Sequence, residues 1–379
     1  MRPVLWACVA ALLPPALANA QSPKPAAAEP ADPAAAWRAY PSLPHELRGV
    51  WATHRADPNW NEAMAYLAAA NINAVFPYFA SAGACWYPSR FLPALTDHDF
   101  AAEAADAGLR HGVAVHARVL GLYAMGAPDE FRQRLHAEGR FMISDKGKPI
   151  RWLCPTSPAN RKLIVDVALE LAWLYPWAGL QVDYLRYPGE EYCFCPRCRK
   201  EFERMVGHSV PNMAEAVKSG PLRQQFLEWR RSQITSLVRE IAQALRAARP
   251  DMLFSAAVLL NWEDHRDCFG QDWKKWADEG LVDFLCPMDY TSDNACFERY
   301  VRQQARWLGG RTPFCPGIGV HATGVNFGGP QMLLDQIALC RSLGASGWII
   351  FNYSPELVTR YLPALALGAT SSPATFQIR

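Results

Sequence analysis

Eight short apolar segments, each followed by a segment with helical spacing, recur between residues 46 and 360 of this 379-residue chain. The apolar segments are rich in β-branched and aromatic residues, which favour strands. They cover residues 46–55, 72–80, 113–120, 179–188, 252–260, 281–290, 313–320 and 346–354. This regular alternation predicts an α/β protein with a parallel sheet and helices packed against it.

Eight strand–helix units are the number that closes a (β/α)8 TIM barrel, and this is the fold class we predict, over residues 44–368. Strands of such a sheet are covered on both faces, which fits their continuous apolar runs. The alternative is an open, doubly wound sheet, which usually has a glycine-rich phosphate loop after its first strand. Here the first strand continues into THRADPNW, which contains no glycine.

The first twenty residues have the three parts of a secretory signal peptide. Arg2 supplies a positive charge, residues 4–17 are apolar, and Ala18-Asn19-Ala20 is typical of a cleavage site. We expect cleavage after Ala20 and a periplasmic or secreted protein, with an uncleaved anchor as the alternative. No later apolar run approaches the roughly 18 residues of a membrane span, so no membrane association is expected after cleavage.

The segments on either side of the predicted barrel have different compositions. Residues 21–43 are rich in Pro and Ala, which is typical of a linker, and disorder is expected up to about Ala36. Residues 369–379 are interpreted as a C-terminal tail. The net charge is +2 and no long basic block is present, which argues against a nucleic-acid partner. The oligomeric state is left open.

Catalytic residues of such a barrel lie at the carboxyl ends of its strands. Asp183 ends the fourth strand, Asp289 ends the sixth, and Glu263 follows the fifth by a few residues. Asp183 is the strongest candidate, as nucleophile or base, because a charge that ends an apolar strand must be useful or paired. Asp289 or Glu263 would then be the general acid. A structural ion pair of Asp183 with Arg186 or Arg118 is the alternative.

Aromatic and cationic side chains share these strand ends. Aromatic rings stack on the C–H faces of sugars, while carboxylates bind hydroxyls and support acid–base chemistry, so the mixture predicts a carbohydrate substrate. The predicted sugar-binding residues are Trp51, His54, Tyr78, His116, Arg118, Tyr184, Arg186, Trp262, Tyr290 and Asn352. For the two histidines, an ordinary position in the core is an equally open interpretation.

Three cysteines follow the fourth strand closely. Cys193, Cys195 and Cys198 form a C-x-C-x2-C pattern, in which disulfides between near neighbours would be strained. Thiolates at this spacing can bind Zn²⁺ tetrahedrally, so we predict a structural zinc ion that holds the loop after Asp183, and no organic cofactor. A disulfide with a free thiol is the alternative. The candidates for the fourth ligand are Cys154 and, after it, Cys85 or Cys268.

Several motifs together resemble a known family: ELRGVWATH, VAVHARV, LCPTSPANRKLI, GLQVDYLRYP and GASGWIIFNYS. Their order over about residues 45–360 is similar to the glycosyl-hydrolase-like family of secreted bacterial TIM-barrel proteins, also described as family 10 glycosylhydrolases. The resemblance implies a glycoside-hydrolase barrel whose strand-four aspartate is Asp183. It implies a reaction class more firmly than a substrate.

The segment CFCPRCRKEF also resembles the zinc-binding segment of family 42 β-galactosidases, which follows strand four and uses one upstream cysteine. This similarity implies zinc here. Those enzymes have a glutamate acid at the end of strand four and a glutamate nucleophile at strand seven. This chain has Asp183 and GIGVHAT at those places, so β-galactosidase activity is not implied. An amylase-like pair would need Glu263, after strand five, to reach the centre.

The sequence therefore predicts an exported glycoside hydrolase that cleaves a poly- or oligosaccharide at the barrel mouth. The alternative is a catalytically silent carbohydrate-binding barrel, with Asp183 as its one central carboxylate, Asp289 salt-bridged and Glu263 facing water. A metal-dependent deacetylase ranks last, because the histidines are scattered and form no H-x3-H pair.

Overall fold

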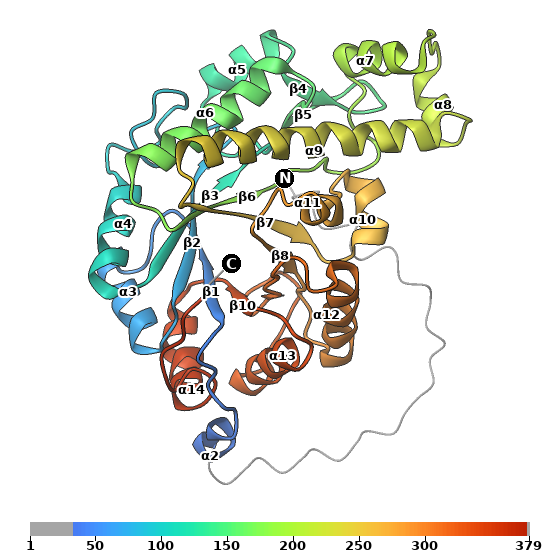
Figure 1. The fold of residues 1–379 in the computed structure, drawn as a ribbon. Coiled ribbons are helices and arrows are strands. Elements are labelled where there is room, and N and C mark those ends of the chain that lie inside the picture. The colour runs from blue at the N-terminus through green and yellow to red at the C-terminus, as the bar shows by residue number, and fades with distance from the viewer. Residues whose placement is uncertain (1–32, 377–379) are drawn as a thin grey trace.

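A computed structural model describes residues 33–376, so the predicted signal peptide and its cleavage site lie outside the described residues. Eight parallel strands close into a barrel in the order β1-β10-β9-β8-β7-β6-β3-β2 (Figure 1). The strands are β1 (Leu47–Ala52), β2 (Ala74–Ser81), β3 (Ala114–Leu120), β6 (Gly179–Asp183), β7 (Leu253–Leu259), β8 (Phe284–Met288), β9 (Gly317–Ile318) and β10 (Gly347–Phe351). The predicted (β/α)8 barrel is confirmed, because β1 pairs with β10 and leaves no open edge.

Helices surround the barrel on its outer side (Figure 1). They are α3 (Trp60–Ala69), α4 (Phe100–His111), α6 (Pro158–Leu174), α9 (Arg223–Ala248), α10 (Trp262–Phe269), α11 (Trp273–Asp278), α12 (Asn294–Leu308), α13 (Pro330–Ser342), a π-helical turn η2 (Leu357–Tyr361) and α14 (Leu362–Leu367). Within residues 33–376, no helix has both the length and the apolar character needed to cross a membrane.

The seventh predicted strand is much shorter than its apolar run. β9 covers only two residues, although the sequence pattern extends over residues 313–320. Pro313 and Pro316 cannot donate a backbone hydrogen bond, so they limit the regular ladder on this side of the barrel. Phe314 still forms an isolated parallel bridge with Leu285, which keeps the barrel closed.

Alternate residues of each strand face the inside of the barrel or the surrounding helices. The interior is filled by an apolar cluster that includes Trp51, Phe76, Phe284 and Ile349, while a larger cluster lies between the strands and the helices. This alternation decides which side chains at the strand ends face the barrel mouth.

Two insertions extend the wall on the side of β3 and β6 (Figure 1). Between β3 and α6 the chain forms α5 (Asp129–Ala137) and a hairpin of β4 (Phe141–Ile143) and β5 (Pro149–Leu153). Between β6 and α9 it forms α7 (Pro196–Val206) and α8 (Met213–Lys218). Both insertions begin at the carboxyl ends of their strands, where the site lies.

The two ends of the described chain pack onto the barrel. Helix α2 (Pro33–Arg38), inside the predicted linker, contacts α14. In the predicted tail, the backbone N–H of Thr375 donates to Pro44, and Phe376 packs edge-on against Phe284 of the barrel interior at 5.4 Å between ring centres. Residues of the predicted tail therefore close the amino-terminal end of the barrel.

Candidate functional site

Asp183 is the last residue of β6, and its side chain points into the barrel mouth. It lies two residues after Gln181, whose side chain binds Trp51 inside the barrel at 2.6 Å. Arg118 Nη1 donates to Asp183 Oδ2 at 3.1 Å, and the backbone N–H of Tyr184 donates to Oδ1 at 2.7 Å. Tyr184 has a positive φ of 54°, an uncommon conformation for a non-glycine residue that often marks functional sites.

The carboxyl of Asp183 is 4 % exposed, and burial has the largest effect on its ionisation. Burial raises the pKa of Asp183 above its ordinary value, while the charges of Arg118 and Arg186 oppose this rise. The salt bridge to Arg118 that the sequence left open is therefore present. Arg118 also donates to the carbonyl of Ala52 on β1, so from β3, the strand beside β6, it connects Asp183 with the end of β1.

Aromatic rings form the floor beneath Asp183. The rings of Tyr290 and Phe351 lie 5.1 Å apart, and each contacts the edge of Trp51 below them. A Cβ atom on Gly319 would lie 2.8 Å from Cβ of Tyr290, so this glycine leaves the space that the tyrosine occupies. The guanidinium of Arg118 lies 5.5 Å from the centre of the Tyr78 ring.

A second group of rings surrounds Arg186. Its guanidinium lies 5.0 to 5.6 Å from the ring centres of Tyr184, Trp152 and Phe269, an arrangement called here the Arg186 box. Tyr123 stacks on Tyr184 at 5.3 Å and extends this wall. The box joins residues of the loop after β6, the β4–β5 hairpin and α10.

His54 belongs to a third group of rings, beside β1 and β2. It stacks on Trp86 at 4.4 Å and contacts Tyr78 edge-on. Burial, with a smaller effect of Arg55, lowers the pKa of His54 to about 4, so the imidazole is neutral near pH 7. Of the predicted sugar contacts, His54, Tyr78, Arg118, Tyr184, Arg186 and Tyr290 lie around Asp183.

Asp289 does not face the mouth. Its side chain points from the end of β8 toward α12 and accepts a hydrogen bond from Gln304 Nε2 at 2.6 Å. Because side chains alternate along a strand, Tyr290 takes the inward position instead. Asp289 is fully buried and has no cationic partner in the described part of the chain, and burial raises its pKa well above the ordinary value. The geometry therefore argues against Asp289 as a catalytic partner of Asp183.

Glu263 and Trp262 lie in the first turn of α10 and also point away from Asp183. Glu263 is exposed and accepts a hydrogen bond from Trp307 Nε1 at 3.3 Å. Trp262 packs against Trp307 and donates to Asp272 at 2.6 Å. Both side chains face α12 and α11, because the helix begins beyond the strand end and turns outward.

Two predicted sugar contacts belong to the packed interior below the mouth. Trp51 is 1 % exposed, and His116 stacks on Phe76 at 4.6 Å beside the start of β6. Burial lowers the pKa of His116 to about 3. His116 is therefore a core histidine, which is the second of the two interpretations that the sequence allowed. Asn352 follows β10 and is half-buried, and it makes no hydrogen bond to Asp183.

The site also contains residues that were not predicted as sugar contacts. Trp152 and Phe269 complete the Arg186 box, and Trp86 stacks on His54. Trp152 lies on the hairpin within the long connection after β3, two residues before Cys154. Its place beside the predicted zinc ligand is the signal that could have identified it.

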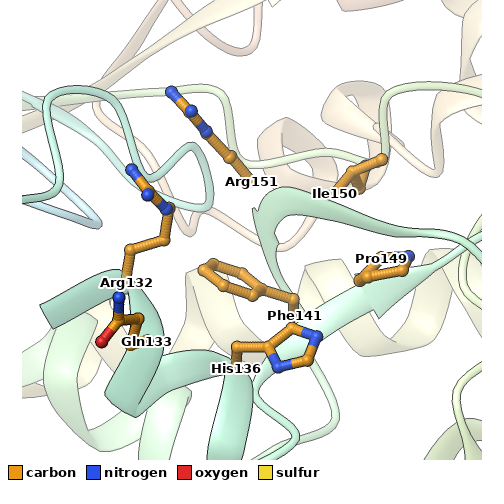
Figure 2. A pocket seen from close by; sticks show the side chains of 7 residues that line it. All are labelled: Arg132, Gln133, His136, Phe141, Pro149, Ile150 and Arg151. Atoms are coloured by element: carbon orange, nitrogen blue, oxygen red, sulfur yellow. The ribbon is translucent and has the colours of Figure 1, made fainter. Parts of the chain in front are cut away.

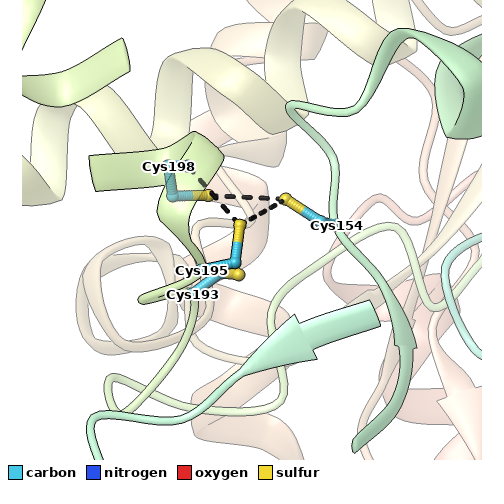
Figure 3. A group of neighbouring side chains, drawn as sticks. All are labelled: Cys154, Cys193, Cys195 and Cys198. Atoms are coloured by element: carbon cyan, nitrogen blue, oxygen red, sulfur yellow. Dashed lines mark hydrogen bonds between the residues drawn. The ribbon is translucent and has the colours of Figure 1, made fainter. Parts of the chain in front are cut away.

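Four buried cysteines come together beside this wall (Figure 3). The Sγ atoms of Cys154, Cys193, Cys195 and Cys198 all lie within 4.8 Å of one another, and Cys154 Sγ is 3.6 Å from Cys195 Sγ and 3.4 Å from Cys198 Sγ. These separations are far longer than the roughly 2.05 Å of a disulfide and close to the roughly 3.8 Å between thiolates bound tetrahedrally to zinc. The described cysteines are all free thiols.

Hydrogen-bond donors surround the four sulfur atoms. The backbone N–H groups of Ile143 and Cys198 approach Cys193 Sγ at 3.5 Å and Cys195 Sγ at 3.4 Å, respectively. Thr156 Oγ1 lies 3.0 Å from Cys154 Sγ. Such donors suit thiolates that hold a metal ion. The structure therefore places Cys154, the first candidate for the fourth ligand, beside the other three cysteines, while Cys85 and Cys268 lie outside the group.

A separate hollow of about 310 Å³ lies against the first insertion (Figure 2). Its lining residues are Arg132, Gln133, His136, Phe141, Pro149, Ile150 and Arg151. Arg132 forms an ion pair with Asp129 at 2.7 Å. Neighbouring side chains of a strand point to opposite faces, so Arg151 lines this hollow while Trp152 faces the Arg186 box. None of the predicted site residues lines it.

The comparisons with solved structures agree with this fold. The glycoside hydrolase domain of PgaB (BpsB) from Bordetella bronchiseptica has a TM-score of 0.66 at 18% identity, over 81% of this chain and 94% of that one. A β-galactosidase from Bacillus circulans sp. alkalophilus has a TM-score of 0.62 at 14% identity, over 82% of this chain and 50% of that one. At these identities the likeness concerns the fold, and this chain spans half of the β-galactosidase.

The comparison with curated proteins gives no match. The sequence model described as Glycosyl hydrolase-like 10 matches residues 127–318, slightly more than half of the chain. The matched segment contains Asp183, the Arg186 box and all four clustered cysteines. The chain therefore belongs to the glycosyl hydrolase-like 10 family.

Proposed function

We propose that this protein is an exported glycoside hydrolase that acts on a poly- or oligosaccharide through Asp183. The observation that carries the proposal is the buried carboxyl of Asp183 at the end of a barrel strand. Arg118 contacts this carboxyl, and aromatic rings lie around and beneath it. The position matches where barrel enzymes carry catalytic groups, and the rings suit the C–H faces of sugars.

In this proposal Asp183 is the general acid. Burial raises its pKa against the opposing charges of Arg118 and Arg186, and in its protonated form the carboxyl can deliver a proton to the leaving glycosidic oxygen. Arg118 orients the carboxyl through Oδ2 and stabilises it after the proton has left. Tyr290 and Tyr78 would contact the sugar from below. This assignment replaces the sequence-based role of nucleophile or base.

A catalytically silent carbohydrate-binding barrel is the second candidate. The specific observation that favours it is the orientation of the other two predicted carboxyls, since Asp289 faces α12 and Glu263 contacts Trp307. Most glycosidases need two carboxyls about 5 to 9.5 Å apart. Asp289 is hydrogen-bonded to Gln304 rather than salt-bridged as that hypothesis expected.

The test is hydrolysis of a panel of glycans and aryl glycosides by the mature protein, together with Asp183→Asn and Glu263→Gln. We expect Asp183→Asn to lower turnover by at least about 100-fold, because the proton donor is lost. The matched control Glu263→Gln should keep full activity, since its side chain contacts α12. Sugar binding without turnover in the wild type would support the silent barrel, and full activity in Asp183→Asn would refute the catalytic role.

We also propose that the four clustered cysteines bind one structural zinc ion. Four thiolates complete a tetrahedral set and leave no open position for a substrate, so the ion would stabilise structure and take no part in hydrolysis. It would connect Cys154, next to Trp152 on the hairpin, with the loop that follows Tyr184 and Arg186. The donor set and the N–H groups around it support this proposal.

The export proposal rests on the first twenty residues of the sequence. The tripartite pattern and the Ala18-Asn19-Ala20 site predict a mature protein that begins at Gln21. Amino-terminal sequencing of the protein recovered from the periplasm or medium tests it. Recovery of the uncleaved chain in the membrane fraction would favour an anchor.

A further inference from the structure

Arg186 is a half-buried cation without an anionic partner among the described residues. Its guanidinium is held by the rings of Tyr184, Trp152 and Phe269, and it forms no hydrogen bond or ion pair within residues 33–376. Its Nε atom is buried and unpaired. The rings lie around the guanidinium, and its N–H donors have no hydrogen-bond acceptor among the described residues.

The other deeply buried arginines differ from Arg186 because each forms an ion pair or several hydrogen bonds, although the Nε atoms of Arg118 and Arg230 are also unpaired. Arg48 pairs with Glu46 at 2.8 Å and donates to the carbonyl of Leu43 at 2.7 Å. Arg118 pairs with Asp183, and Arg230 donates to three backbone carbonyls, two at the end of α10 and one in the loop after β6. A buried cation without such partners is costly, so the contrast indicates that Arg186 meets its partner only when a ligand is bound.

The groups that face Arg186 form no ion pair with it, although the charge of Asp183 acts on it. Asp183 is already paired with Arg118. Burial and Arg186 lower the pKa of His265 to about 4 against the opposing effect of Asp264, and burial raises the pKa of Cys268 to about 11, so both side chains are neutral near pH 7. Asp264 is exposed and binds Asn261 Nδ2.

Two other acidic groups near this wall are paired elsewhere, and Glu191, whose charge also acts on Cys268, forms no ion pair with Arg186. Glu190, whose charge acts on Cys268, forms an ion pair with Arg223 at 3.0 Å. Asp272 accepts from Trp262. Arg186 therefore has no acidic side chain within ion-pair distance among the described residues.

We infer that the sugar bound at this mouth carries an oxyanion, either a uronate carboxylate or a sulfate ester, and that Arg186 binds it. A planar guanidinium matches such a group through two parallel N–H···O bonds, and the three rings hold that plane in place. The inference rests on the proposed carbohydrate function and names the substrate class of the same site.

The experiment measures the affinity of the mature protein for three sets of oligosaccharides of equal length: neutral, uronate-containing and sulfated. We expect one acidic set to bind roughly ten- to a hundredfold more tightly than the neutral set, as a charge-assisted contact requires. The preferred set separates a carboxylate from a sulfate.

Variants tie the preference to Arg186. In Arg186→Met the acidic preference should fall to near unity, and in Arg186→Lys it should be intermediate because the charge remains without the planar fork. Arg266→Met is the matched control: Arg266 also lies over a ring, that of Trp262 at 4.6 Å, but away from the mouth, and the preference should be unchanged. Circular dichroism and melting temperature verify that each variant is folded.

The outcomes separate this inference from the proposed function. Equal binding of neutral and acidic sets by the wild type, or an acidic preference that persists in folded Arg186→Met, overturns the inference and leaves a carbohydrate site in place. Absence of binding to every glycan overturns the carbohydrate function and the inference with it.

Discussion

Asp183 and Asp289 both stand at the end of a barrel strand, but they face opposite sides of the barrel wall. Asp183 points into the mouth, where its proposed acid role requires the protonated carboxyl. We therefore predict that kcat/KM falls as the pH rises through the raised pKa of Asp183, because the proton donor is lost. A pH profile of hydrolysis measures this. Activity that instead increases with pH over the same range would assign Asp183 as base or nucleophile.

Asp289 lies in the apolar layer beneath α12, where burial raises its pKa well above the ordinary value. Above about pH 4 an unfolded aspartate ionises while the folded one keeps its proton, so stability is lost as the pH rises toward the folded pKa. An asparagine at this position does not ionise, so it loses no stability as the pH rises, and its side-chain oxygen can still accept the hydrogen bond from Gln304. We predict that Asp289→Asn is about 1 kcal/mol more stable than the wild type near pH 8 and equal to it near pH 4.

Urea unfolding at the two pH values measures the effect of Asp289→Asn. The control is Glu298→Gln, which removes an exposed ion pair with Arg302 and should change stability little at either pH. A variant that is less stable than the wild type near pH 8 would show that the carboxyl is ionised in the folded protein.

Among the elements, the β4–β5 hairpin and the loop before α7 meet at the four clustered cysteines and at backbone hydrogen bonds such as Phe194 N–H to Ile143. We predict about one zinc ion per chain in the wild type and loss of that ion in Cys154→Ser, because a hydroxyl replaces one of four thiolates. The variant should be destabilised, and fluorescence of Trp152 should change as the Arg186 box loosens. Elemental analysis measures the metal, and Cys315→Ser, a buried thiol outside the cluster, is the control.

A metal-free wild type with the same melting temperature as a zinc-loaded sample would contradict the structural role. Full retention of zinc by Cys154→Ser would instead mean that Cys154 is not a ligand.

β1 is held at its start by a buried ion network that also involves α13. Glu46 is 3 % exposed and pairs with Arg48 at 2.8 Å and with Arg341 at 2.6 Å. Removing the shared carboxylate leaves two cations without their anion, so Glu46→Gln should destabilise the fold by about 3 kcal/mol or more. Denaturant unfolding measures the change. A loss below about 1 kcal/mol would show that backbone carbonyls satisfy both arginines.

At the scale of the whole molecule, the two ends of the barrel differ: the candidate site lies at the carboxyl ends of the strands, and the ends of the described chain pack at the amino-terminal end. The described tail pairs with the segment before β1, and Phe376 covers Phe284 at the amino-terminal end of the barrel. We predict that Phe376→Ala lowers stability by about 1–2 kcal/mol, because apolar area returns to water, and leaves activity unchanged. The exposed Phe91→Ala should alter neither. A loss of activity in folded Phe376→Ala would indicate coupling between the two ends.

Much of this architecture could be predicted because it follows from short-range patterns in the sequence. Apolar runs separated by amphipathic helices predicted all eight strands, and a charge at the end of the run GLQVD identified Asp183. The spacing of Cys193, Cys195 and Cys198 predicted a thiol cluster. Each of these signals depends on a few neighbouring residues and on their burial.

The rest was decided by tertiary structure. Whether Asp289 or Tyr290 faces the mouth depends on one step of strand alternation, and the direction of Glu263 depends on how α10 turns away after β7. Cys154 and Trp152 reach the site from a hairpin that the sequence presents only as a long connection. Local sequence thus determined the barrel and its central carboxyl, whereas the set of side chains around that carboxyl was decided by long-range packing, because residues far apart in the chain meet there.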